Sequence, residues 1–261
     1  MMSKIEQLDK EYVWHPFTQM QQWLEAPQTV ITDAEGIMLY DEKGRSYYDG
    51  VSSLWVNIHG HRRAEIDEAI IAQLGRVAHS TALGLANVPG SELAKMLVEV
   101  APAGLEKVFY SDDGATAVEI ALKMAFQYWQ LKGQVKKTKF VTLQSAYHGD
   151  TIGAVSVGGI DLFHQVYKPM LFEAYHVSAP SCYHCQLAQP GSCNMECLQE
   201  LETVLQAHEG EIGAMIIEPL VQMAAGMLKA PAGYLRGVRE LTKKYGVLLI
   251  ADEVAVGLLN G

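Results

Sequence analysis

Long apolar runs are missing from this sequence of 261 residues, and their absence excludes several classes of protein. No stretch reaches the about 18 consecutive apolar residues that a membrane-spanning helix needs. The first ten residues are polar and lack the apolar centre of a secretory signal peptide. Basic residues are also scarce, since 20 lysines and arginines stand against 30 aspartates and glutamates. We therefore expect a cytoplasmic protein with neither a membrane nor a nucleic acid as its partner.

Cysteine is confined to one short segment, Cys182, Cys185, Cys193 and Cys197, which does not resemble a disulfide framework spread through a secreted fold. Four thiolates within sixteen residues are also a candidate zinc site, with His184 as an alternative ligand. The spacing between the two pairs is shorter than in common zinc ribbons. A loop with free thiols is therefore the other interpretation, and a non-catalytic fragment with a zinc-binding module is one candidate function.

Charged residues make up only 19% of the chain and hydrophobic residues 49%, which favours a sizeable buried core. The periodicity predicts helices at 3–12, 62–78, 90–100, 115–131, 196–207 and 234–244. It predicts short antiparallel strands within 28–49 and further strands at 107–110, 140–143, 212–218 and 247–251.

The alternation of apolar strands and amphipathic helices indicates an α/β fold with a mostly parallel sheet and helices on both faces. The earlier part of the chain reads differently. We expect residues 1–80 to be a piece of a smaller α+β domain and residues 81–261 to form a larger domain.

Residues 111–116, Ser-Asp-Asp-Gly-Ala-Thr, lie between an expected strand and an expected helix. Exposed amides at a helix start, with Gly114 allowing close approach, bind anions such as phosphate. Taken alone, however, the segment favours an ordinary turn in which Asp112 or Asp113 caps the helix.

Polar and aromatic residues follow three of the expected strands, at the positions where open α/β sheets place ligands. Tyr147, His148 and Gly149 follow the strand at 140–143, and a ring at this point either stacks on a flat ligand or lies half-buried in a turn. Glu218 and Asp252 each end a buried strand. An acid at such a position is often only a turn residue, but it is also suited to hold the protonated ring nitrogen of pyridoxal phosphate (PLP).

Together these segments resemble the class III subgroup of the fold-type I, PLP-dependent aminotransferases. The motifs that carry the resemblance are residues 111–119, 147–149, 217–219 and 249–253. Residues 14–20, 52–61 and 147–158 also resemble the biotin-pathway branch of this subgroup. Another class III omega-aminotransferase is the alternative.

The resemblance implies a role for several residues of this chain. Asp252 would pair with the pyridine nitrogen, Tyr147 would stack on the ring, and Glu218 would lie near the phenolic side of the cofactor. The amides of Gly114 and Ala115 would hold the phosphate. The remaining implied residues are His148 beside the cofactor and, for the substrate, Phe17, Trp55 and Tyr147.

The implied reaction transfers an amino group from S-adenosylmethionine, or from lysine, to 8-amino-7-oxononanoate and gives 7,8-diaminononanoate. The implied assembly is a homodimer.

No lysine follows Asp252 among the residues given, and the match to the family pattern fails at Val256. The resemblance places the Schiff-base lysine and the C-terminal small domain after this point. We therefore expect a truncated form that lacks the C-terminal small domain, has no catalytic residue of its own and is inactive alone.

Overall fold

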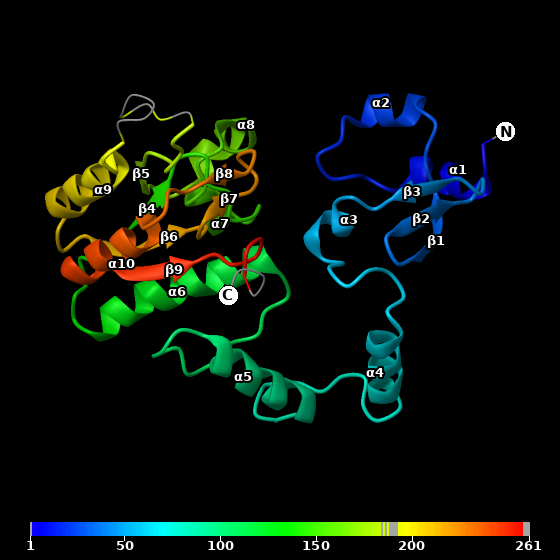
Figure 1. Ribbon diagram of the computed structural model, residues 1–261, viewed down its shortest axis with the longest axis horizontal. Helices are drawn as coiled ribbons and strands as arrows, with labels where there is room; N and C mark the ends of the chain where they lie inside the picture. The colour runs from blue at the N-terminus through cyan, green and yellow to red at the C-terminus, as the bar shows by residue number, and fades with distance from the viewer. Residues whose placement is uncertain (1, 184, 186, 188–192, 258–261) are drawn as a thin grey trace. The chain divides into compact units, whose positions relative to one another are not determined.

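The computed structural model describes residues 2–183, 185, 187 and 193–257, and the chain divides into two compact units, Met1–Glu106 and Lys107–Gly261 (Figure 1). The division falls later than the boundary that we expected after residue 80. The assignment of residues 1–80 to a small domain therefore stays a prediction.

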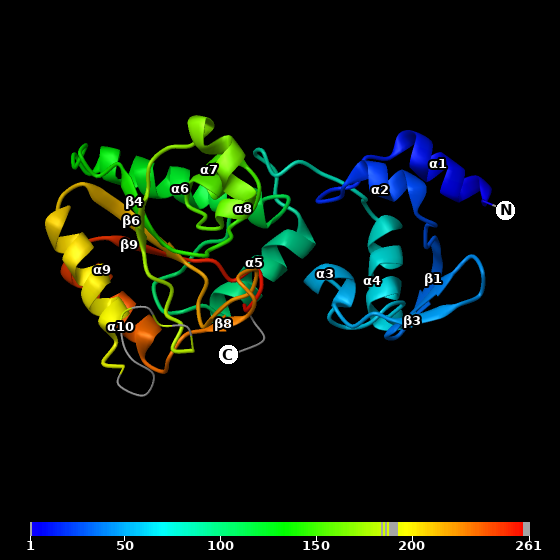
Figure 2. The ribbon, with the colours of Figure 1, turned by 90° about the horizontal axis from the view of Figure 1, so that it is seen from above.

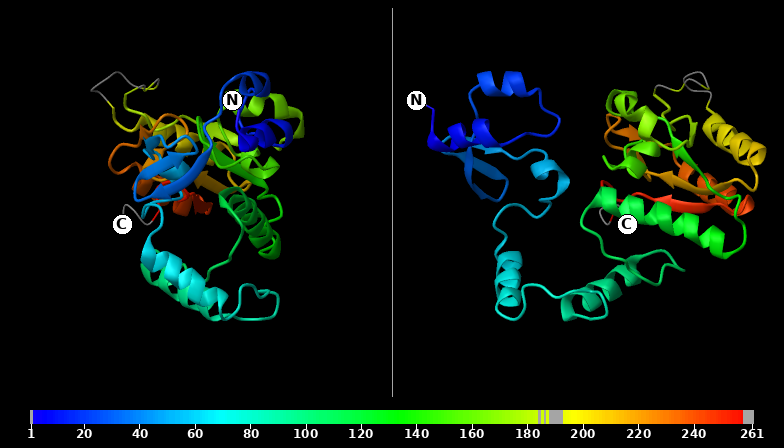
Figure 3. Two further views of the ribbon diagram at one scale, coloured as in Figure 1. Left: turned by 90° about the vertical axis from the view of Figure 1, so that its right-hand side faces the viewer. Right: turned by 180° about the vertical axis from the view of Figure 1, so that it is seen from behind.

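The first unit is built on a three-stranded antiparallel sheet in the order β1-β2-β3, drawn in blue in Figure 3. Its strands are β1 (Ile31–Glu35), β2 (Met38–Asp41) and β3 (Ser46–Tyr48). These strands confirm the short antiparallel strands expected within 28–49, and residues 41–44 form the turn between β2 and β3.

The carboxylate of Asp41 holds this turn. Its Oδ1 accepts hydrogen bonds from the amides of Lys43 at 3.0 Å and Arg45 at 2.8 Å. Its Oδ2 accepts from Nε of Arg45 at 2.6 Å and from the hydroxyl of Tyr47 at 3.0 Å. One buried side chain at the start of the turn thus satisfies donors within the turn and on the strand that follows it.

The helices of the first unit are α1 (Lys4–Tyr12), α2 (Met20–Glu25), α3 (Ser52–Trp55), α4 (Ala64–Leu74) and α5 (Val88–Val100). Side chains cap the longer ones where the sequence offers them, since Ser3 accepts from the amide of Glu6 and Asn87 accepts from that of Gly90. The helices expected at 3–12, 62–78 and 90–100 are confirmed as α1, α4 and α5.

The second unit contains a four-stranded parallel sheet in the order β5-β4-β6-β9. The strands are β4 (Lys139–Leu143), β5 (Tyr175–Val177), β6 (Ile212–Ile217) and β9 (Leu248–Ala251). The central strand β6 is buried at all six positions, which explains its uninterrupted apolar sequence.

Helices cover both faces of this sheet (Figure 2). On one face, α6 (Gly114–Leu131) and α7 (Ile152–Ser156) pack with Ala214 and Ile216 of β6. On the other, α9 (Glu196–Ala207) and α10 (Tyr234–Lys244) pack with Met215 and Ile217. Successive residues of β6 thus pack into the hydrophobic cores on opposite faces of the sheet, because side chains alternate along a strand. The predicted architecture is confirmed.

The remaining elements of this unit are α8 (Asp161–His164), the 3₁₀ helix η1 (Gln165–Met170) and a hairpin of β7 (Val221–Gln222) with β8 (Leu228–Lys229). The strand expected at 107–110 is wrong, because this segment is irregular. An apolar run becomes a strand only where a neighbouring strand accepts its hydrogen bonds, and Phe109 instead remains 65% exposed. None of the described helices is long and apolar enough to cross a membrane.

Candidate functional site

Two acidic residues meet at one edge of the parallel sheet. Glu218 directly follows β6 and Asp252 directly follows β9, and these strands are paired in register with Ile217 opposite Ala251. The amide of Asp252 donates to the carbonyl of Ile217 at 2.8 Å, so the pairing continues to the acid itself. Parallel pairing therefore places both carboxyl groups at the carboxyl edge, as the sequence predicted.

Asp252 is paired with His148 inside the protein. Nδ1 of His148 lies 2.7 Å from Oδ2 of Asp252, and the side chains are 0% and 6% exposed. Oδ1 of Asp252 accepts from the amide of Val254 at 3.1 Å. The contact with His148 fixes the carboxyl group in place, and its oxygens keep further lone pairs for another donor.

The other ring nitrogen of His148 has no partner among the described residues, although it is buried. A buried polar atom without a partner is uncommon in native proteins and marks a position where a ligand or water completes the site. The sequence placed both His148 and Asp252 at the site, but not their pairing.

Glu218 holds residues 147–149, called the aromatic turn from here on, and the loop after β6. One oxygen accepts from the amide of Tyr147 at 3.2 Å and the other from the amide of Met223 at 3.1 Å. Burial raises the pKa of Glu218, and the charge of Asp252 adds to that rise, while the two amides and His148 oppose it.

The hydroxyl of Tyr147 donates to Oδ2 of Asp150 at 2.8 Å. Burial and this hydrogen bond raise the pKa of Tyr147 to about 12. The phenol is therefore neutral at physiological pH and presents an uncharged, half-buried ring at the sheet edge.

The start of α6 lies beside this turn. Asp113 caps the helix through a hydrogen bond from the amide of Thr116 at 2.8 Å, and the hydroxyl of Thr116 accepts from the amide of Asp113 at 3.0 Å. The capped turn expected from the sequence is thus present. The amides of Gly114 and Ala115 belong to the first helical turn, where helix geometry provides no acceptor, so they remain suited to an anion.

Two glycines bring these segments into close contact. A Cβ on Gly149 would lie 2.5 Å from Cβ of Ala115, and one on Gly114 would lie 2.8 Å from Cγ2 of Val254. The aromatic turn, the helix start and the loop after β9 therefore meet at one place, although the sequence separates them by tens of residues.

The expected substrate residues Phe17 and Trp55 lie in the first unit. The side chain of Phe17 is 74% exposed and that of Trp55 is partly buried. Their part in a substrate pocket stays a prediction.

The proposed zinc site is not supported. The described residues, which include all four cysteines, contain no group of three or more histidine, cysteine or acidic side chains able to hold a metal ion. Burial, followed by the neighbouring Cys193, raises the pKa of Cys197 to about 11. In the absence of a metal this thiol is therefore protonated at neutral pH. His184, the alternative ligand, lies outside the described residues.

The assembled site suits an anionic aromatic ligand such as PLP. It combines a buried carboxylate, an uncharged ring, two amide donors in the first turn of α6 and two glycines that allow the segments to approach closely. The carboxylate would accept from a protonated ring nitrogen, and the helix start would receive a phosphate.

Comparisons with known proteins agree with this chemistry. The family model described as "Aminotransferase class-III" matches residues 20–260. The adenosylmethionine-8-amino-7-oxononanoate aminotransferase of Geobacter sulfurreducens is 54% identical over 251 residues, which are 95% of this chain and 55% of that protein. The chain spans about half the length of the curated relatives that it matches.

Solved structures show the same relationship. The crystal structure of the Methanocaldococcus jannaschii enzyme of that name has a TM-score of 0.90 and 47% identity, and the match covers 97% of this chain and 55% of that one. An (S)-enantioselective omega-transaminase from Thermomicrobium roseum has a TM-score of 0.87 and 35% identity, covering 95% and 56%.

Proposed function

Since the chain belongs to the class III aminotransferase family, we propose that its second unit is the PLP-binding part of a transaminase that acts in biotin synthesis. The observation that carries the proposal is the buried pair of His148 and Asp252 at the sheet edge, next to the first turn of α6.

In this proposal Asp252 has the central electrostatic task. Its carboxylate, desolvated and held by His148, would keep a pyridine nitrogen protonated, and PLP when bound supplies an electron sink for the substrate carbon. His148 fixes the orientation of the carboxylate and leaves its second nitrogen at the site. Because the histidine is fully buried, it also excludes water from one side of Asp252.

The other residues of the site bind and orient. The amides of Gly114 and Ala115 would hold the phosphate, aided by the positive end of the helix dipole. Tyr147 would stack on the ring, since its neutral phenol is fixed by Asp150. Glu218 would face the phenolic side of the cofactor and meanwhile fixes the turn that carries Tyr147.

The substrates are proposed from the relatives. Those with 47–54% identity are named as aminotransferases of 8-amino-7-oxononanoate. We therefore propose this compound as the amino acceptor, with S-adenosylmethionine or lysine as the donor and 7,8-diaminononanoate as the product. A homodimer and a cytoplasmic location belong to the same proposal, and the free thiols of the four cysteines fit a reducing compartment.

Another omega-aminotransferase activity is the second candidate. The solved omega-transaminase structures share the fold at TM-scores of 0.87–0.89, but at 26–35% identity. The higher identity to the biotin-pathway relatives is the reason for preferring the first candidate.

Catalysis also requires a lysine that this sequence does not offer at the site. The residues after Asp252 contain none, so we propose that the 261-residue chain binds PLP without covalent attachment and does not transaminate by itself.

Intact mass measured after saturation with PLP and reduction with borohydride tests this proposal. Bound PLP is quantified in parallel by equilibrium dialysis. We expect about one equivalent of bound PLP and no stoichiometric pyridoxyl group on the chain. A pyridoxyl group fixed on one specific lysine would show that the chain has its own attachment residue. Absence of PLP binding would contradict the proposed function.

A further inference from the structure

The single turn α3 has an unusual backbone. All four of its residues have positive φ, with 51° at Ser52, 49° at Ser53, 65° at Leu54 and 76° at Trp55. L-residues other than glycine avoid this left-handed region, and a succession of them is rarer still. Such a conformation persists only where surrounding contacts impose it.

One carboxylate supplies these contacts. Asp49, which follows β3, accepts from the amide of Ser53 at 2.8 Å and from its hydroxyl at 2.8 Å. The Asp49 side chain is 5% exposed. The amide and hydroxyl of Ser53 lower the pKa of Asp49, so that the group is ionised at neutral pH.

Asp49 is itself fixed to the sheet at two points. Its amide donates to the carbonyl of Ile37 at 2.8 Å, and its Oδ2 lies 2.8 Å from Nε2 of His61. His61 forms an antiparallel bridge with Gly36, at the turn between β1 and β2. The carboxylate is therefore held by the sheet and in turn holds the left-handed turn.

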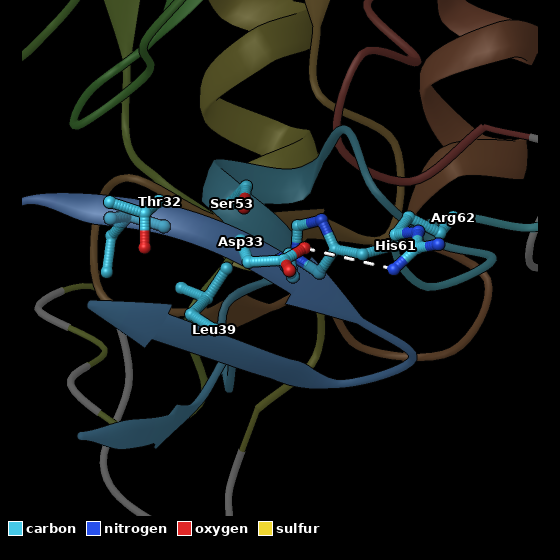
Figure 4. Close-up of a pocket in the computed structure, with 8 residues that line it drawn as sticks. Thr32, Asp33, Leu39, Ser53, His61 and Arg62 are labelled. Carbon is cyan, nitrogen blue, oxygen red and sulfur yellow. Dashed lines mark hydrogen bonds and ion pairs between the residues drawn. The ribbon is translucent and has the colours of Figure 1, made fainter. Parts of the chain in front are cut away.

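The turn α3 and His61, which contacts Asp49, lie together beside β1. Ser53, His61 and Arg62 line an open pocket with Thr32, Asp33 and Leu39 (Figure 4). Downstream of Ser53, the amide of Trp55 donates to Val51 at 2.9 Å and that of Asn57 donates to Ser52 at 3.0 Å. Trp55 thus takes its direction from a backbone that Asp49 fixes.

We propose that Asp49 is a positioning residue that imposes the left-handed turn and thereby fixes the orientation of Trp55. If Trp55 contacts the substrate, Asp49 also determines the geometry of that contact, and this part of the inference rests on the proposed function. The structural part depends on neither PLP nor amino transfer.

The test uses the 261-residue chain labelled with 5-fluorotryptophan. We expect its four tryptophans to give separate ¹⁹F resonances, and W55F assigns that of Trp55. We expect D49A to shift or broaden the Trp55 resonance and to leave those of Trp14, Trp23 and Trp129 in place. Amide exchange at Ser53, Trp55 and Asn57 should accelerate at least about tenfold, because their fixed hydrogen bonds are lost.

A second substitution separates positioning from general stabilisation. Glycine enters the left-handed region without a steric cost, so D49A/L54G should restore the Trp55 resonance and the protection of Trp55 and Asn57. D33N, which alters a more exposed acid of the same pocket, should leave Trp55 unchanged.

Two results would overturn the inference: a Trp55 resonance and local exchange in D49A like those of the wild type, or no restoration by L54G. If D49A also removes the Trp23 resonance, D49L, which has the shape of aspartate but no acceptor, decides by the same criteria. Failure of the proposed function would appear instead as a loss of PLP binding, which this experiment does not measure.

Discussion

At the scale of single residues, the candidate site depends on positions where there is no room for a further carbon atom. Gly149 has a φ of +115° and lies against Ala115, with the Cα of Ala115 only 2.9 Å from the point where a Cβ would stand. Because the obstacle includes backbone, it cannot move aside as a flexible side chain does. The helix start and the aromatic turn can therefore approach each other only through glycine.

We expect G149A to lower the free energy of unfolding by about 1–3 kcal/mol more than the strain of a positive φ alone would, because the added methyl group overpacks the contact with Ala115. The same variant should weaken PLP binding. The matched control is G210A. Gly210 also has a positive φ, of +83°, but nothing lies within 4 Å of a Cβ placed there. Urea unfolding of both variants separates the two effects, and equal losses of stability would contradict the close-approach argument.

Asp41 gives a second prediction, concerning pH. Burial raises the pKa of this carboxyl, but the hydrogen bonds from Arg45, Tyr47 and the amide of Lys43 outweigh burial and lower the pKa to about 2. A carboxyl whose folded pKa is depressed stabilises the fold above its ordinary pKa of about 4, and this contribution is lost as the pH falls toward 2.

The urea midpoint of D41N should therefore lie below that of the wild type at pH 6, and the difference should shrink between pH 4 and pH 2. D33N, at an exposed acid of the neighbouring strand, should show no comparable change. A constant difference between D41N and the wild type over this pH range would refute the assignment.

At the scale of elements, α6 connects the helix start that we propose for the phosphate to the sheet. Near its other end, the indole Nε1 of the buried Trp129 donates to the carbonyl of Gly213 in β6 at 2.8 Å. A Cβ on Gly213 would stand 3.0 Å from Cδ1 of Trp129, so the glycine admits the indole. The contact holds α6 against β6.

W129F should lower the free energy of unfolding by about 1–3 kcal/mol, because it leaves a buried carbonyl without its donor. The neighbouring Y128F alters a half-exposed side chain and should change stability by less than about 0.5 kcal/mol. Thermal unfolding of the two variants is the measurement. A W129F variant as stable as Y128F would show that the hydrogen bond contributes little.

The elements also show which parts of the fold the sequence could predict. The helices at 196–207 and 234–244 were predicted with the bounds that the structure has, because each carries a periodic apolar face. The segment at 107–110 was predicted wrongly, since strand formation depends on a partner that a local pattern does not reveal. The positive φ values of α3 could not be predicted, because its four residues include neither glycine nor asparagine.

The candidate site was predictable in its residues more than in its contacts. Asp252 and Glu218 follow apolar strands, which is a local signal, whereas the pairing of His148 with Asp252 joins residues 104 positions apart. The role of Asp49 could not be predicted from the sequence, because an acid after a short strand is common in turns.

At the scale of the whole molecule, the chain contains the expected PLP-holding residues but spans only about half the length of its curated relatives. Every residue that we assign to the cofactor lies between Gly114 and Asp252, in the second unit. The role of these residues can therefore be tested on this chain by PLP binding alone.

The most direct test is an equilibrium titration of the chain with PLP, comparing the wild type with D252N. Loss of a hydrogen bond between charged groups, worth about 1.5–3 kcal/mol, should weaken binding roughly 10- to 150-fold. E253Q, at the adjacent and more exposed acid, should bind PLP like the wild type. Equal affinities of D252N and the wild type would contradict the central role given to Asp252.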